Sequence, residues 1–338
     1  MPQQSNPKEL ARATWIRGSI YALIVVFILL IKATFSVLLL ILAGVLIAVY
    51  FRGLSGLICR KTKWPQGLCL VISIVGSLLL LAGFFWLAGA KVQAQVQELS
   101  DQFPQMVSRA KAELSKSPLG QKIVEKASSP DTAKKAQDLA KTFFKSTFGV
   151  LGDVYVVLFL GLFFTSAPST YKRGIVAVVP KKGKAEAENL LETLGNTLKK
   201  WLKGKIFSMA IVFVLTAIGL VIMDVPMWLT LALLAGILNF IPNFGPIIAL
   251  VPAVLVGLMQ GTTTALLVAG LYILVQVLES NVITPQIQKR LVEIPPALII
   301  IAQLLMGALT GGWGLVLATP VIAIIMVTVR ELWVKKQS

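Results

Sequence analysis

Long apolar runs separated by short polar or basic stretches follow one another along most of the chain. Several of these runs extend for about 17 to 23 residues without a charged side chain, the length that a helix needs to cross a hydrocarbon core of about 30 Å. The runs that we interpret as full membrane-spanning helices are 15–31, 34–51, 67–90, 148–166, 206–223 and 262–283. The pattern predicts an all-α polytopic membrane protein of about eight membrane segments, including interrupted or re-entrant helical hairpins, with a small extracytoplasmic helical insert.

The amino-terminal runs predict the topology. Because only Lys32 and its neighbours separate the first two runs, we expect a tight antiparallel hairpin with Lys32 at the far interface. A secretory signal peptide is not expected, because no small-residue cleavage site precedes the second run. The loop 52–66 carries four basic and no acidic residues. The positive-inside rule therefore predicts cytoplasmic amino and carboxyl termini in a multi-pass protein of the bacterial cytoplasmic (inner) membrane.

Between Lys91 and residue 146 the composition becomes that of a soluble segment, with ten basic and six acidic residues. Apolar residues at helical spacing predict that the third span continues as one helix over 67–103 and projects beyond the membrane. These residues are Val92, Val96, Leu99 and Phe103. Their apolar stripe needs a partner, which residues 123–144 supply either within the protomer or between protomers.

We divide the chain into four segments. They are a cytoplasmic amino terminus with the helical hairpin (1–66), a third span that extends into an extracytoplasmic helical domain (67–147), a fourth span with a basic cytoplasmic amphipathic segment (148–205), and a transport core with two interrupted hairpins (206–338). In the third segment, Ala185–Lys203 is rich in glutamate at its start and in lysine at its end, which complements the helix dipole. It is interpreted either as a helix on the membrane surface or as a cytosolic linker helix.

The last third of the chain contains apolar segments that are too short to cross a membrane comfortably. Segments 227–240 and 246–259 flank a break rich in Pro, Asn and Gly, and a helix of about fourteen residues covers only about 21 Å. Segments 297–309 and 315–334 flank a glycine-rich break. Each pair follows a full span, so the pattern suggests an inverted repeat. Each pair is either a re-entrant hairpin or two spans in a locally thinned membrane.

Interrupted helices at membrane depth indicate a pathway, because unpaired backbone groups cost several kcal/mol in hydrocarbon and persist only where protein or water satisfies them. At the first interruption, Asn239 and Asn243 offer amide groups to a polar solute. Pro242 and Pro246 free backbone carbonyls that suit a cation, and Gly245 permits unusual backbone geometry. The alternative interpretation is a plain turn between two short spans.

Glu279 lies near the predicted cytoplasmic end of its span, with Gln276 on the same helical face. An intramembrane carboxylate is costly and by default marks a functional site. The alternative is an interfacial cap that pairs with Lys289 or Arg290. The complete candidate pathway for a solute or ion comprises Asn239, Pro242, Asn243, Gly245, Pro246, Gln276, Glu279, Asn281, Pro285, Gln303, Gly311, Gly312 and Pro320.

Composition narrows the class of protein. Of 338 residues, 56% are hydrophobic and 14% charged, and the mean hydropathy is +0.82, which excludes an ordinary cytosolic enzyme. The net charge is +17, but the basic residues flank apolar runs and form no aromatic-interleaved platform. We therefore expect membrane lipid as a partner and no nucleic acid.

The residue types also limit the chemistry. Histidine is absent, and the two cysteines, Cys59 and Cys69, cannot supply a metal cluster or the disulfide framework of a small secreted domain. The chain has no Walker-type, nucleophile-elbow or HExxH motif. The sequence therefore predicts no cofactor, no metal site, no direct ATP coupling and no enzymatic activity.

Three ordered motifs resemble the autoinducer-2 exporter family of bacterial permeases. They are Leu238-Asn-Phe-Ile-Pro-Asn-Phe-Gly-Pro246 followed by Val251-Pro-Ala253, then Glu279-Ser-Asn-Val-Ile-Thr-Pro285, and Gly311-Gly-Trp-Gly-Leu-Val-Leu-Ala-Thr-Pro320. The resemblance covers nearly the whole chain. The chain departs from it at Phe244, where members often have a smaller residue, and at Ile294-Pro295, where a His-Pro pair is frequent.

The resemblance implies ATP-independent export of a small polar solute, which is autoinducer-2 in the family's namesake, coupled to an ion gradient. It also implies a homo-oligomer, with a pentamer expected. The sequence as a whole predicts a secondary transporter that works by alternating access, with Glu279 as coupling carboxylate or gate and H⁺ or Na⁺ as coupling ion.

Two alternatives remain at this point. Other members of the family resemble sodium(lithium)/proton antiporters, and this alternative requires transport that responds to sodium and pH. The second alternative is a non-transporting membrane scaffold. It predicts that Asn243→Ala and Glu279→Gln leave function intact, whereas deletion of residues 91–146 abolishes it.

Overall fold

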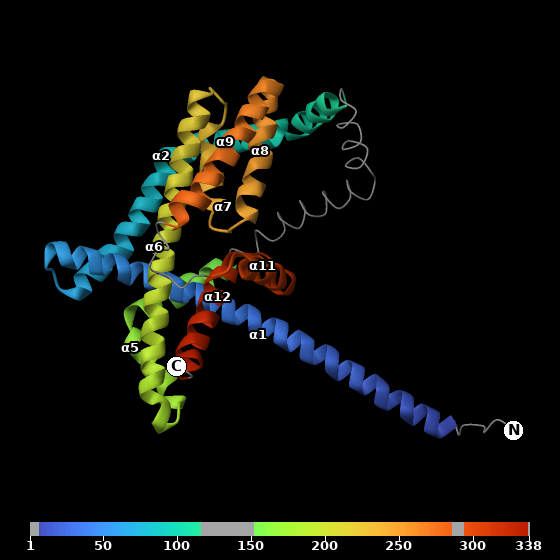
Figure 1. The fold of residues 1–338 in the computed structure, drawn as a ribbon, viewed down its shortest axis with the longest axis vertical. Helices are drawn as coiled ribbons and strands as arrows, with labels where there is room; N and C mark the ends of the chain where they lie inside the picture. The colour runs from blue at the N-terminus through green and yellow to red at the C-terminus, as the bar shows by residue number, and fades with distance from the viewer. Residues whose placement is uncertain (1–6, 116–151, 286–293, 337–338) are drawn as a thin grey trace.

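We describe a computed structural model of the chain, which covers residues 7–115, 152–285 and 294–336 (Figure 1). Helices dominate the described residues, and no strand occurs among them. In chain order they are α1 (Pro7–Thr62), α2 (Gln66–Leu114), a helix over Gly152–Ser166, α5 (Pro168–Val178), a 3₁₀ turn (Lys181–Gly183), α6 (Lys184–Ile222), α7 (Trp228–Leu238), α8 (Phe244–Gln260), α9 (Thr262–Leu278), a π-helical turn (Glu279–Ile283), α11 (Pro296–Thr310), α12 (Gly312–Leu332) and a 3₁₀ turn (Val334–Lys336). The prediction of an all-α protein is confirmed.

Within the described ranges, five helices are long and apolar enough to cross a membrane. A sixth candidate is Gly152–Ser166 together with α5, which bend by 89° where Pro168 prevents a continuous helix. α7, α8 and α11 are apolar but shorter, so the total of about eight membrane segments stays a prediction. Large apolar side chains such as Leu80 and Ile222 are exposed on the outside of the helices, as expected where a protein faces lipid. The chain is a membrane protein.

The predicted amino-terminal hairpin is wrong. α1 continues through Lys32 as one helix of 56 residues, and its amino-terminal part extends away from the other helices (Figure 1). The connection Lys32-Ala-Thr34 contains neither glycine nor proline, and lysine and alanine are good helix formers. α1 ends instead before Lys63, whose left-handed backbone (φ 57°) is soon followed by Pro65.

α2 continues well past the part that is apolar enough for the membrane, Gln66–Gly83. The predicted helix over 67–103 lies within it, and helical structure extends to Leu114. On this extension, Gln95 Oε1 accepts hydrogen bonds from Thr230 N (3.2 Å) and Thr230 Oγ1 (2.7 Å), which caps the first turn of α7. Residues 123–144, the predicted partner of the apolar stripe, lie outside the described residues, and that pairing stays a prediction.

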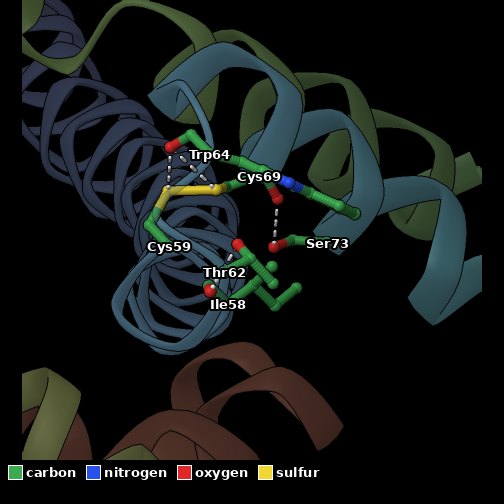
Figure 2. The surroundings of a disulfide bond; sticks show 6 residues. All are labelled: Ile58, Cys59, Thr62, Trp64, Cys69 and Ser73. Carbon is green, nitrogen blue, oxygen red and sulfur yellow. Dashed lines mark hydrogen bonds between the residues drawn. A yellow bond between two sulfur atoms is a disulfide. The ribbon is translucent and has the colours of Figure 1, made fainter.

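A disulfide bond joins Cys59, near the end of α1, to Cys69 in the first turn of α2 (Figure 2). The two Cα atoms are 5.7 Å apart, and the sulfur atoms lie 3.5 and 3.6 Å from the carbonyl oxygen of Trp64. The sequence analysis did not expect this bond. It sits at the loop that the positive-inside rule places in the cytoplasm, where thiols are usually kept reduced. The disulfide bond therefore indicates an oxidising compartment for this loop, whereas the charge pattern indicates the cytoplasm.

Alkylation of the cysteines distinguishes these two indications. We expect that N-ethylmaleimide, added to cells before lysis, leaves both Cys59 and Cys69 unmodified, because a disulfide sulfur does not react with it. After reduction, both cysteines become modified, as measured by mass spectrometry of the intact chain. Modification of both without a reductant would show that the thiols are free, and would favour a cytoplasmic loop.

α6 is the central element of the fold. Its 39 residues join the predicted segment Ala185–Lys203 to the predicted span 206–223 without a break, so the segment boundary at 205/206 falls inside a helix. Gly204 does not interrupt the helix, since one glycine in a helix interior costs only about 1 kcal/mol. The apolar face of the basic part is buried against other helices near its carboxyl-terminal end, and its placement on the membrane surface or in the cytosol stays a prediction. The buried residues are Leu198, Trp201 and Leu202.

The described helices pack into two hydrophobic cores, one at each half of α6. The carboxyl-terminal half of α6 packs with α7, α8 and α9, which we call the α7–α9 bundle. The amino-terminal half packs with α1, Gly152–Ser166, α11 and α12, which we call the α11–α12 bundle. Figure 1 shows the two groups beside opposite ends of α6. The two interrupted hairpins of the segment 206–338 thus pack into different cores, and its role as a transport core stays a prediction.

The two interrupted hairpins share local features that support the predicted repeat. The second helix of each begins after a residue with left-handed backbone, Asn243 (φ 64°) before α8 and Gly311 (φ 67°) before α12. A glycine in the first turn of each second helix lies against a backbone carbonyl of the first helix. The contacts are Gly245 with Leu238 and Gly314 with Met306. Each second helix also contains a proline, Pro252 or Pro320.

Candidate functional site

A cavity of about 250 Å³ opens beside the middle of α6, where the two bundles meet. Its walls come from α6, the break between α7 and α8, the end of α9 with its π-helical turn, the start of α11 and the middle of α12. Polar side chains gather here although the surrounding helices are apolar. They are Lys205, Ser208, Asn239, Asn243, Gln276, Glu279, Ser280, Thr284 and Thr319. A cavity with convergent polar groups is the default candidate for a binding site.

The carboxylate of Glu279 is buried, with 7% of the residue exposed, and both of its oxygens are hydrogen-bonded. Oε1 accepts hydrogen bonds from Ser208 Oγ (2.7 Å) and Thr284 Oγ1 (2.9 Å). Oε2 accepts longer ones from Ser280 Oγ (3.4 Å) and Gln276 Nε2 (3.5 Å). A buried carboxylate requires such donors, because removal from water penalises its charge.

The local backbone explains why several donors reach one carboxylate. α9 ends at Leu278, and Glu279–Ile283 forms a π-helical turn, which is wider than an α-helical turn. The hydroxyl of Thr284, five residues after Glu279, thereby returns to the carboxylate. π-Helical turns inside α-helices occur frequently at functional sites. Lys289 and Arg290, the alternative partners of Glu279, lie outside the described residues.

A series of hydrogen bonds connects Glu279 to the break between α7 and α8. Asn239 Nδ2 donates to Ser208 Oγ (2.9 Å), which in turn donates to Glu279 Oε1 (2.7 Å). All three side chains are buried. Asn239 holds its place because its backbone N–H closes the last turn of α7 by donating to the Ala235 carbonyl. Any shift of the break relative to α6 therefore changes the surroundings of the carboxylate.

Gln303 of α11 binds the same break from the other bundle. Its Nε2 donates to the Pro242 carbonyl (2.7 Å), and its Oε1 accepts from Asn243 Nδ2 (3.2 Å). The Gln303 side chain is fully buried. A backbone carbonyl at the helix break is thus satisfied by protein, as membrane depth requires. These two hydrogen bonds tie the α7–α9 bundle to the α11–α12 bundle.

Replacement of Gln303 by leucine is expected to destabilise the protein by about 1–3 kcal/mol, because the partly buried Pro242 carbonyl loses its donor. The measurement is thermal unfolding of the purified chain in detergent. Leu304→Ala, on the exposed side of the same helix, is the matched control and should unfold close to wild type. An unfolding temperature of Gln303→Leu equal to that of wild type would contradict the assigned bonds.

The cavity brings together part of the predicted pathway. Asn239, Pro242, Asn243, Gln276 and Glu279 line it. Gln303 lies directly behind Pro242 and Asn243 through the hydrogen bonds described above. These six residues come from three separate parts of the chain, and the fold places them within one cluster.

The other predicted residues do not line the cavity. Gly245 and Pro246 form the first turn of α8, and Pro320 is buried within α12 next to Thr319. Asn281 Nδ2 donates to the carbonyl of Val277 on its own helix (3.0 Å), and Pro285 is exposed. Gly311 and Gly312 form the exposed turn before α12, near Trp313, whose Nε1 donates to Asp153 Oδ2 (2.7 Å).

Five polar lining residues are absent from the predicted pathway: Lys205, Ser208, Ser280, Thr284 and Thr319. Lys205 and Ser208 were assigned to a basic surface segment and to a plain span. Their spacing of three residues puts both on one helical face at the start of an apolar run, which is the signal that could have identified them. The contribution of Thr284 depends on the π-helical turn, which no sequence pattern indicated.

The chain is similar to a family of transporters and to several bacterial transport proteins. The family described as "AI-2E family transporter" matches residues 20–333. "Putative transport protein YrrI" of Bacillus subtilis is 28% identical over 169 residues, which cover 50% of this chain and 48% of YrrI. "AI-2 transport protein TqsA" of Escherichia coli K12 is 29% identical over 110 residues, 32% of each chain. The chain thus spans about half or less of the length of these relatives. Since the family match extends over most of its residues, the chain belongs to the AI-2E family of transporters.

Proposed function

We propose that the protein is a secondary, ATP-independent transporter that exports a small polar solute by alternating access around the cavity at the middle of α6. The observation that carries this proposal is the buried carboxylate of Glu279, held by Ser208 and Thr284 in a polar cavity between two separately packed bundles. A charged group in the membrane interior marks a solute or proton pathway by default.

The mechanism follows from the contacts between the bundles. Gln303 ties the α7–α8 break to the α11–α12 bundle, and Asn239 ties the same break to Ser208 and Glu279. If the bundles rock about α6, these contacts break and re-form around a fixed site. A bound solute or a proton on Glu279 biases that equilibrium by binding one arrangement more tightly than the other.

Autoinducer-2 is the first solute to test, because the relative TqsA carries it in its name. The experiment measures flux of labelled autoinducer-2 from proteoliposomes that hold the full chain, with and without an imposed proton gradient. We expect flux that increases with the gradient and stops with a protonophore. Absence of flux under every gradient would overturn autoinducer-2 as the substrate.

Sodium(lithium)/proton antiport is the second candidate, and it is favoured by the oxygen atoms around Glu279. The carboxylate and the hydroxyls of Ser208, Ser280 and Thr284 form a compact set of oxygen ligands, which hard cations prefer. This candidate predicts that a sodium gradient drives proton movement in the same proteoliposomes without any organic solute. Insensitivity to sodium would remove it.

The surroundings of the protein complete the proposal. We place the chain in the bacterial inner membrane with cytoplasmic amino and carboxyl termini, as the basic loops indicate. A homo-oligomer, with a pentamer expected from the family resemblance, would cover part of the exposed apolar surface. Mass measurement of the intact complex in a membrane mimic tests the number of subunits.

A further inference from the structure

Lys205 stands apart from the other polar groups of the cavity. It lies on α6, one turn before Ser208, and lines the cavity together with Glu279, with which it interacts electrostatically. In the part of the chain that the structure describes, no hydrogen bond or direct ion pair holds its ammonium group. A half-buried cation without hydrogen-bond acceptors is unfavourable unless something else supplies them.

Glu279 does not fill that role. Its two oxygens already accept hydrogen bonds from Ser208, Thr284, Ser280 and Gln276. The carboxylate is therefore held by the α9 side of the cavity and by Ser208. Within the described residues, the positive charge of Lys205 is compensated only by its electrostatic interaction with Glu279.

Thr319 of α12 is the second group of the cavity that lacks a hydrogen-bond partner among the described residues. Its residue is 5% exposed, its Oγ1 has no hydrogen-bond partner among residues 7–115, 152–285 and 294–336, and it lines the same cavity from α12. A buried hydroxyl is usually hydrogen-bonded, most simply to the carbonyl one turn earlier in a helix. Among the described residues this hydroxyl has no acceptor, although its residue lines the cavity.

We propose that the cavity binds an oxyanion, a carboxylate or phosphate group, with Lys205 Nζ and Thr319 Oγ1 as donors. The inference rests on the proposed transport function and narrows it, because the transported solute then carries an anionic end. A group with two or more acceptor oxygens satisfies both donors at once. Part of the remaining wall is apolar, with Trp201, Ile294 and Ile299, and suits a short carbon skeleton. The cavity volume of about 250 Å³ admits a small organic acid or phosphate ester.

The two charged residues of the cavity should then have opposite effects on anion binding. Removing the charge of Lys205 removes an attraction. Removing the charge of Glu279 removes a repulsion, because the carboxylate of Glu279 and the bound anion are both negative and share one cavity. A purely structural role for both residues predicts that both replacements weaken binding, so the signs separate the two explanations.

The experiment measures binding of sodium acetate and sodium phosphate to the full chain by isothermal titration calorimetry, in nanodiscs of zwitterionic phosphatidylcholine. Acetamide and choline chloride are the neutral and cationic comparisons. Lys205→Met should weaken anion binding by at least about tenfold, as for loss of a hydrogen bond from a charged group, and Lys205→Arg should restore much of it. Thr319→Val should weaken it by a smaller factor. Glu279→Gln should bind at least as tightly as wild type.

The matched control is Lys203→Met. Lys203 is an exposed lysine on the same helix that lines a different groove, so its replacement should leave anion binding unchanged. Equal binding of acetate and acetamide, or unchanged anion binding in Lys205→Met, would overturn the proposal.

A second experiment adds phosphatidylglycerol to the nanodiscs. If the titration responds only to this lipid and not to the soluble anions, the group is a lipid headgroup and the proposal of an anionic solute fails.

Flux is measured separately from anion binding, so that failure of the anion site and failure of the transport function can be distinguished. Anion binding that depends on Lys205, without flux under any gradient, would leave the anion site standing and overturn the proposed transport function. Flux of a neutral solute without anion binding would support the proposed transport function and overturn the anion site.

Discussion

Glu279→Gln is expected to abolish gradient-driven flux while the protein still folds. Glutamine has nearly the same shape as glutamate but carries no charge and does not exchange a proton. One oxygen remains to accept from Ser208 and Thr284, so the cavity keeps its packing. We expect flux to fall by at least about 100-fold, the lower end of the effect of a single positioned proton-transfer group.

The measurement compares proteoliposomes of wild type and Glu279→Gln under the same imposed proton gradient. Glu331→Gln is the control, because Glu331 forms an exposed ion pair with Lys335 four residues later. Such surface pairs contribute little to stability. Flux in Glu279→Gln at the wild-type rate would contradict the assigned role of Glu279 and would favour the non-transporting scaffold.

Gly245→Ala is expected to destabilise the protein strongly. A Cβ atom at residue 245 would run into the backbone carbonyl of Leu238, so the α7–α8 hairpin must open to admit a single methyl group. Overpacking of this kind costs about 1–3 kcal/mol or more, because a backbone atom cannot swing away as a side-chain end can. The expected result is a lower unfolding temperature and a lower yield in detergent.

The repeat supplies a second test and α9 supplies a control. Gly314→Ala should have a comparable effect, because its Cβ would meet the Met306 carbonyl at the corresponding place in the other hairpin. Gly270 lies in α9 with nothing within 4 Å of an added Cβ. Gly270→Ala should therefore be neutral or slightly stabilising, by about 0.5–1 kcal/mol at most. Three equal unfolding temperatures would refute the close approach of the helices in both hairpins.

Much of the helix framework could be predicted from the sequence. Uninterrupted apolar runs identified the spans later found in α1, α2, α6 and α9, and the Pro/Gly breaks identified both interrupted hairpins. α12 was predicted as one half of an interrupted hairpin, whereas its 21 residues are long and apolar enough to span a membrane. The hydrophobic pattern does this well because the length of an apolar run and the absence of charge are local properties. Asn239 and Glu279 were identified for the same reason, as polar residues in places where hydrocarbon penalises them.

The predicted helix boundaries were wrong where a helix continues through a polar or basic stretch. A lysine at residue 32 interrupts an apolar run but not a helix, and the basic stretch before residue 206 changes composition without changing secondary structure. Charge reports where a helix leaves the membrane, whereas only a residue such as proline, or a left-handed backbone, ends the helix itself.

The site could be predicted only in part, because its remaining members depend on packing between distant segments. Ser208 meets Glu279 across 71 residues of sequence, and Gln303 meets Pro242 across 61. Lys205 and Thr319 line the same cavity from α6 and α12, which are 114 residues apart in the sequence at these positions. No spacing rule within one helix reveals such neighbours.

The central claim is that the cavity beside Glu279 opens alternately to the two sides of the membrane. The most direct test uses Ser280→Cys, an exposed lining residue, in a chain that also carries Cys59→Ser and Cys69→Ser. A membrane-impermeant methanethiosulfonate reagent is applied to right-side-out and to inside-out vesicles, and labelling is measured by mass. Val178→Cys, at an exposed position of α5 away from the cavity, reports the orientation of the vesicles.

We expect Cys at position 280 to be labelled from both sides, at rates that an imposed gradient shifts in opposite directions, whereas position 178 is labelled from one side. Labelling of position 280 from a single side under every gradient would contradict alternating access at this cavity.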